Sequence, residues 1–70
     1  MTSSTWYVVK RKDGTWVGAR IGRYFRRERG DGYSRVRAGL ARLLRNKADA
    51  ERIARLVGGK IVTATVTYDD

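Results

Sequence analysis

The chain has 70 residues and a formal net charge of +9, and lysine or arginine occupies 16 positions. A chain of this length forms one domain with a thin core, so we expect a single domain over residues 1–70. The sequence has no cysteine and no histidine, which excludes disulfides, thiolate chemistry and the most common metal ligand; we therefore expect no cofactor and no metal.

The N-terminal third predicts a β-hairpin. Residues 1–4 are expected to be a flexible terminus and lack the features of a signal peptide. Residues 6–12 and 15–21 are rich in aromatic and β-branched types, and Asp13-Gly14 between them is a strong hairpin signal.

A two-residue turn at this point would place Lys10 opposite Val17 and Val8 opposite Ala19. That register predicts an apolar face that packs under a helix, formed by Trp6, Val8, Val17, Ala19 and Ile21. It also predicts an opposite aromatic and basic face, formed by Tyr7, Val9, Arg11, Trp16, Gly18 and Arg20.

The middle of the chain is ambiguous. Residues 22–29 either extend the sheet or form a basic loop, and residues 30–32 predict a turn. Apolar residues between 36 and 44 recur at helical spacing, which favours a helix over residues 34–45 with Ser34 as its N-cap. Gly39 and the arginines of the first turn disfavour that helix, and a short strand remains the alternative.

The last third gives the clearest pattern. Lys47–Val57 predicts a helix that Asn46 caps and Gly58-Gly59 ends, with an apolar stripe at Ala50, Ile53, Ala54 and Val57. Residues 60–68 alternate as a strand, and residues 69–70 are a tail. The sequence thus predicts an α+β fold: a small antiparallel sheet, made of the N-terminal hairpin and the C-terminal strand, with one or two helices packed on one face.

The charge pattern points to an anionic partner. Nine arginines lie between positions 20 and 45, and Glu28 and Asp31 are the acidic residues among them. Aromatic rings can stack on bases while arginine contacts phosphates. The candidate residues for binding nucleic acid or another partner are Tyr7, Arg11, Trp16, Arg20, Arg23, Tyr24, Arg26, Arg27, Arg29, Arg35 and Arg37.

No constellation suggests catalysis. The seven acidic residues are dispersed, and none lies beside a nucleophile in a recognisable pattern, so we expect a protein that is not an enzyme. No apolar run is long enough to cross a membrane, and we expect no membrane partner and a cytoplasmic location.

A family resemblance concerns about half of the chain. The segment at residues 46–62, with its helix ending in Gly-Gly before a strand, together with the hairpin at residues 6–16, resembles small uncharacterised phage or prophage proteins of ββαβ type. The resemblance implies a mobile-element origin and location in the host cytoplasm, but it assigns no site residues. The arginine-rich middle departs from the pattern.

Two functions remain open at this point. One is a nucleic-acid-binding module. The other is a phage-encoded inhibitor that docks on a host protein that handles nucleic acid, such as a polymerase, a nuclease or a CRISPR effector complex. An apolar centre with a basic rim would favour a protein partner.

Overall fold

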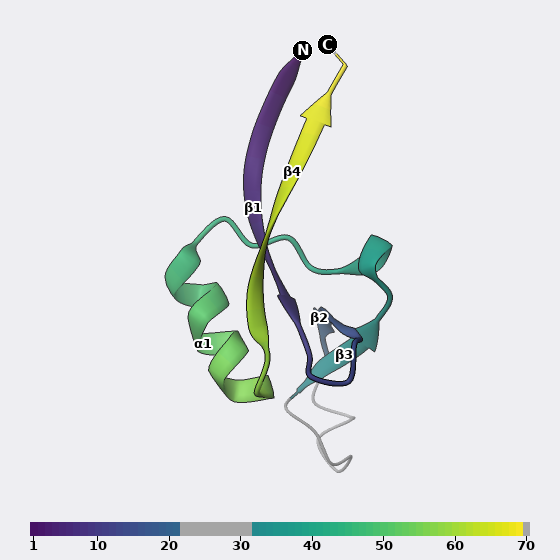
Figure 1. Cartoon of the computed structure of the whole chain (residues 1–70), viewed down its shortest axis with the longest axis vertical. Coiled ribbons are helices and arrows are strands. Elements are labelled where there is room, and N and C mark those ends of the chain that lie inside the picture. The colour runs from purple at the N-terminus through teal and green to yellow at the C-terminus, as the bar shows by residue number, and fades with distance from the viewer. Residues whose placement is uncertain (22–31, 70) are drawn as a thin grey trace.

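The computed structural model describes residues 1–21 and 32–69. Four strands form an antiparallel sheet in the order β3-β2-β1-β4, and one α-helix packs on one side of it (Figure 1). The α+β class predicted from the sequence is confirmed. The elements are β1 (Thr2–Lys10), β2 (Trp16–Arg20), β3 (Tyr33–Val36), a 3-10 helix η2 (Ala38–Leu40), α1 (Lys47–Val57) and β4 (Lys60–Tyr68).

The helix α1 has the bounds that its local signals predict. The Asn46 side chain accepts a hydrogen bond of 2.8 Å from the backbone N–H of Ala48, which satisfies one free donor of the first turn. Gly58 ends the helix with φ 69°, and the N–H of Gly59 donates to the carbonyl of Ala54 at 2.8 Å. These caps fix both ends of the helix and lead the chain directly into β4.

The core lies between α1 and one face of the sheet. The helix contributes its predicted stripe, and the sheet contributes alternate residues of β1 and β2. Tyr7, Tyr33, Val57 and Ile61 pack around the edge of this cluster. The buried members are Val9, Val17, Leu44, Ala50, Ile53 and Ala54.

The first hairpin has a three-residue loop, and the two-residue turn predicted from the sequence is wrong. The N–H of Arg11 donates to the carbonyl of Thr15 at 2.8 Å, and the N–H of Gly14 donates to the carbonyl of Arg11 at 3.1 Å. Gly14 has φ 89°, a conformation in which glycine is favoured. Lys10 consequently pairs with Trp16.

In this register, the β1 side chains lie on the opposite face of the sheet from the one predicted. A one-residue shift between paired strands moves every side chain of one strand to the other face relative to its partner. Val9 and Val17 now share the buried face, where each is 1% exposed. Trp6 and Val8, which we expected under the helix, lie on the opposite face, and Tyr7 and Val9 lie on the helix side.

The segment after β3 is not the α-helix that apolar spacing predicts. Residues 33–36 pair with β2, for example Val36 with Trp16, and only η2 is helical between β3 and Asn46. Leu44 then exchanges two backbone hydrogen bonds with Tyr7, of 2.7 and 2.8 Å. These pairings satisfy the backbone over part of the segment and bring Leu44 into the core.

A two-stranded arm extends from the body. The strands β1 and β4 pair along their whole length, from Thr2 with Tyr68 to Lys10 with Lys60. Residues 2–4, expected to be a flexible terminus, instead belong to β1. We call residues 2–5 and 65–68 the arm; they project well beyond the helix, and both chain ends lie at the tip (Figure 1).

Candidate binding face

The outer face is the side of the sheet that faces away from α1. Side chains alternate along a strand, so the pairing of β1 with β2 and with β4 places every second side chain of these three strands on this side. Among the described residues, every ionised side chain of β1, β2 and β4 that points to this side is basic. We define the outer face as Trp6, Val8, Lys10, Trp16, Lys60, Val62 and Ala64.

Both tryptophans of the chain lie half-buried on the outer face, and each has a cation over its ring. The Nζ atom of Lys10 lies 5.5 Å from the ring centroid of Trp16. The Cζ atom of Arg45 lies 4.8 Å from the ring centroid of Trp6. Trp16 on β2 pairs with Lys10, which lies four residues along β1 from Trp6, a rise of about 13 Å along the strand. The two rings can therefore contact two separate planar groups, with a cation beside each.

Trp6 is held in place by a hydrogen bond within its own strand. Its Nε1–H donates to the Oγ atom of Ser4 at 2.7 Å, which satisfies the polar group of the indole. Arg45 reaches this ring because it directly follows Leu44, whose backbone pairs with β1. The non-local pairing at Leu44 thus positions one cation of the outer face.

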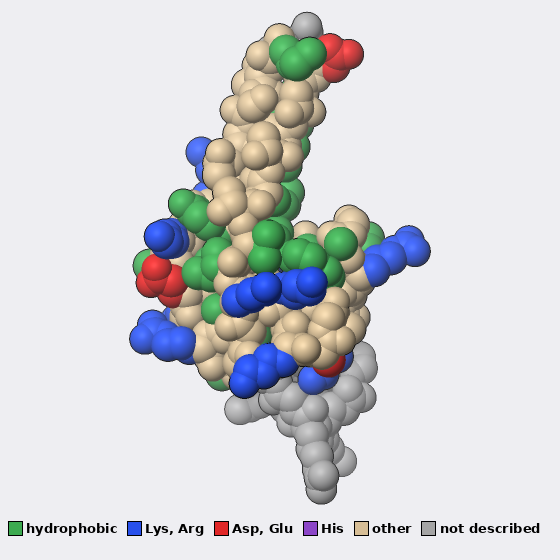
Figure 2. Space-filling view, in the orientation of Figure 1, with side chains coloured by type: hydrophobic (Ala, Val, Ile, Leu, Met, Phe, Trp, Pro, Cys, Tyr) green, Lys and Arg blue, Asp and Glu red, His purple; other side chains and the backbone are tan. Residues whose placement is uncertain are grey.

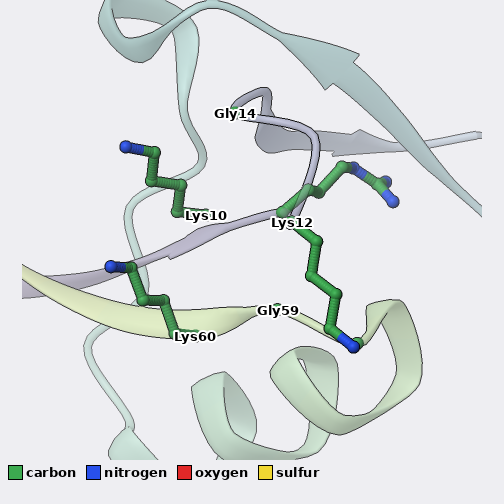
Figure 3. A pocket seen from close by; sticks show the side chains of 7 residues that line it. Lys10, Lys12, Gly14, Gly59 and Lys60 are labelled. Atoms are coloured by element: carbon green, nitrogen blue, oxygen red, sulfur yellow. The ribbon is translucent and has the colours of Figure 1, made fainter.

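A hollow lies at the hairpin end of the sheet, where β1, its loop and the start of β4 meet (Figure 3). Its volume is about 460 Å³. The side chains of Lys10 and Lys60 extend side by side in one direction, and that of Lys12 extends toward the end of α1 (Figure 3). The lining residues are Lys10, Arg11, Lys12, Gly14, Gly58, Gly59 and Lys60.

On the face of the molecule that Figure 2 shows, basic side chains are scattered over the body. The arm, by contrast, consists of threonine, serine, valine and tyrosine and carries no charge. In the described residues, Asp13 pairs with Arg35 and Asp49 pairs with Arg52, both on exposed surface. These two pairs leave most of the positive charge of the body uncompensated.

The structure disperses the site residues predicted from the sequence. Trp16 lies on the outer face, as an exposed-platform role requires. Tyr7 instead packs against the core on the helix side. Arg11 is buried, 5% exposed, and its Nη2 donates to the carbonyl of Tyr33 at 3.1 Å. The predicted grouping of Tyr7 and Arg11 with Trp16 on one open face is therefore wrong.

The remaining predicted residues do not join the outer face as a group. Arg20, Arg35 and Arg37 are exposed, and the Nε atom of Arg35 lies 3.2 Å from the Oδ2 atom of Asp13. Gly18, expected on the open face, is buried beside β3: a Cβ atom there would lie 2.5 Å from Ser34 Oγ. Arg23, Tyr24, Arg26, Arg27 and Arg29 lie outside the described residues.

Sequence reasoning missed Trp6, Lys10 and Lys60 on the outer face, and it missed Arg45 over the ring of Trp6. The pattern held one signal for them. A three-residue loop places Val9 opposite Val17, and two β-branched apolar residues on one face are better placed in a core than Val8 opposite Ala19. That choice would have assigned Trp6 and Lys10 to the open face.

No protein-family model, curated protein or solved structure matches this chain. Among the described residues, no helix is long and apolar enough to cross a membrane. The case for function therefore rests on the geometry of the outer face.

Proposed function

We propose that the protein binds single-stranded nucleic acid through its outer face, without catalysis. The observation that carries this proposal is the pairing of each tryptophan ring with a cation, Trp16 with Lys10 and Trp6 with Arg45. Bases stack on such rings with little sequence preference, and cations beside the rings contact the phosphates.

The interaction free energies favour replacement of the cation on the ring by a base. A cation over an exposed ring contributes about 0.5–1 kcal/mol, whereas stacking of a base contributes about 1–3 kcal/mol. A base can therefore displace Lys10 or Arg45 from the ring face. The displaced cation remains tethered next to the ring, where the phosphate of the same nucleotide arrives.

Intrinsic fluorescence tests the proposal directly, because Trp6 and Trp16 are the two tryptophans of the chain. We expect short single-stranded DNA or RNA to quench this fluorescence at physiological salt. The logarithm of the binding constant should fall with the logarithm of the salt concentration, with a slope of about −0.7 for each phosphate neutralised.

Variants identify the surface. Trp6→Leu and Trp16→Leu should each weaken binding roughly fivefold or more, because each removes one stacking platform. Leu56→Ala is the matched control, since Leu56 is an exposed apolar residue on α1, 59% exposed. Binding that is lost at physiological salt, or that is as strong in both tryptophan variants as in the wild type, would refute the proposal.

A second candidate function is docking on a host protein, as a phage-type inhibitor. The observation that favours it is the partly exposed apolar pair of Val62 and Ala64 on the outer face, on the same strand as Lys60, together with the exposed leucines at positions 40 and 43. An apolar centre with a charged rim is typical of protein interfaces. The oligonucleotide titration separates the two proposals: absence of binding above low salt favours docking.

A further inference from the structure

The hollow at the hairpin end gathers three of the four lysines of the chain, Lys10, Lys12 and Lys60. Glycines 14, 58 and 59 complete the wall together with Arg11, so the lining exposes backbone between positive side chains. Among the described residues, no carboxylate lines the hollow. Its volume of about 460 Å³ lies within the usual range for small-ligand pockets.

Lys10 and Lys60 are directly opposite each other on the paired strands β1 and β4. Like charges at directly opposite positions of an antiparallel pair destabilise the sheet. Their side chains nevertheless extend side by side in the same direction (Figure 3). Neither lysine takes part in the ion pairs Asp13–Arg35 and Asp49–Arg52 of the described residues.

The end of α1 accounts for the direction of Lys12 only, and Lys10 also contacts the ring of Trp16. The C-terminal carbonyls of a helix attract cations. Lys12 extends toward this end of α1, and its Cε atom lies 4.0 Å from the position of a Cβ atom on Gly58. Lys10 and Lys60 point away from the helix, so the helix dipole does not account for their juxtaposition.

We propose that the hollow holds a phosphate group, with the ammonium groups of Lys10 and Lys60 as its direct ligands and Lys12 on the opposite wall. A bound phosphate would turn the repulsion between Lys10 and Lys60 into two charge-assisted hydrogen bonds. The hollow also has room for the sugar that carries the phosphate.

The position of the hollow links it to the stacking face. Lys10 contacts both, because its Nζ atom also lies 5.5 Å from the ring centroid of Trp16. A nucleotide with its base on Trp16 would present its phosphate to Lys10 and Lys60. Assigning the phosphate to a nucleic-acid strand rests on the proposed function; binding of a phosphate group to the lysines does not.

Inorganic phosphate is the first probe, titrated at constant ionic strength with sodium chloride as the balancing salt. We expect saturable shifts of the backbone amide NMR signals of Gly14, Gly58 and Gly59. Phosphate should also raise the melting temperature, because a ligand that binds the folded state stabilises it. Absence of both effects, or equal effects from chloride alone, would overturn the proposal.

A double variant separates a binding role from a structural role. Lys10→Gln with Lys60→Gln should weaken phosphate binding about tenfold or more, since each charge-assisted bond is lost. The same variant removes the like-charge repulsion and also the contact of Lys10 with the Trp16 ring, so without phosphate its melting temperature should stay close to that of the wild type. Lower stability together with unchanged phosphate affinity would contradict the proposal.

Lys47→Gln is the matched control, because it removes the same charge from the one lysine outside the hollow. It should leave phosphate affinity unchanged within about twofold. A loss equal to that of the double variant would show that net charge alone attracts phosphate, and would overturn the proposal.

Oligonucleotides distinguish the source of the phosphate. A single strand with a 5′ or 3′ terminal phosphate is compared with the same strand without one. If the protein binds the strand with the terminal phosphate more tightly, and this preference disappears in the double variant, the hollow binds a terminal phosphate. If the two strands bind with equal affinity and the double variant weakens both equally, the hollow binds internal phosphates. If inorganic phosphate binds but no oligonucleotide does, the hollow is a site for a small phosphorylated molecule and the proposed function fails separately.

Discussion

Gly59 shows how one residue without a side chain fixes the approach of β4 to β1. A Cβ atom at this position would collide with the carbonyl oxygen of Lys10. The chain leaves α1 through Gly58 and must enter β4 at once, so the two strands meet backbone against backbone. Gly59 also belongs to the lining of the hollow, together with Lys10 and Lys60.

We expect Gly59→Ala to destabilise the fold by about 1–3 kcal/mol, because the added methyl group forces the strands apart. Urea denaturation measures the change. Gly39→Ala is the control: nothing lies within 4 Å of a Cβ atom there, so its effect should stay within about 0.5 kcal/mol. Equal losses in both variants would show that the contact at Gly59 is relaxed at little cost.

The loop of the first hairpin is stabilised by the carboxylate of Asp13. Its Oδ1 atom accepts hydrogen bonds from the hydroxyl of Thr15, at 2.5 Å, and from the backbone N–H of Thr15, at 2.9 Å. The Thr15 hydroxyl and then the Thr15 backbone N–H hold the pKa of this carboxyl below its ordinary value; desolvation opposes them, and Arg35 adds a smaller lowering effect.

This shift predicts the sign of one pH effect. Because the folded-state pKa of Asp13 is lowered, the carboxylate contributes stability above its unfolded pKa of about 4, and this contribution is lost as the pH falls through the folded pKa. As the pH is lowered from about 6 to about 2, the melting temperature should fall less for Asp13→Asn than for the wild type. Asp69→Asn is the control, and parallel curves for Asp13→Asn and the wild type would contradict the prediction.

Elements with local signals could be predicted, and elements fixed by distant contacts could not. The bounds of α1 follow from Asn46 and Gly58, which act within one helical turn. The fold class follows from the same kind of pattern. The helix expected after Ser34 fails because Val36 finds a partner in Trp16 and Leu44 finds one in Tyr7, each far away in the sequence.

The set of residues in the candidate site also depends on a contact between residues far apart in the sequence. The composition predicts tryptophan and basic residues as the material of a binding face, and this stays a prediction; the strand pattern placed Trp16 on the side of the sheet away from the helix, where it lies. The loop length of the hairpin then decided which other residues joined it. Asp13-Gly14 is compatible with loops of two and of three residues, and packing of Val9 against the core selects the longer loop.

The molecule as a whole separates a charged body from an uncharged arm. Its extents of 44 × 21 × 21 Å reflect the projection of β1 and β4 beyond the helix. A two-stranded ribbon is only marginally stable in isolation, so the arm depends on the pairing that continues into the body. The tip at Thr2 and Tyr68 is the place where this pairing is expected to open first.

Joining the two ends with a short flexible linker tests that expectation. Closure should raise the free energy of unfolding by about 2–4 kcal/mol, as a cross-link of similar span does, because the unfolded chain loses conformational freedom. A linear chain with the same added residues is the control. Oligonucleotide affinity should be unchanged by the closure. Lower stability of the closed chain would show that the two ends are not neighbours in solution.

The adjacency of Thr2 and Tyr68 also means that the order of the elements along the chain is not essential to their arrangement in space. Once the tip is sealed, the backbone is a ring, and the ring can be opened elsewhere. An opening at the exposed Gly39 would divide the three-residue η2 between the two new ends, while β1 and β4 become a continuous hairpin. Such a circular permutant would keep Trp6, Trp16 and the lysines of the hollow in their present positions.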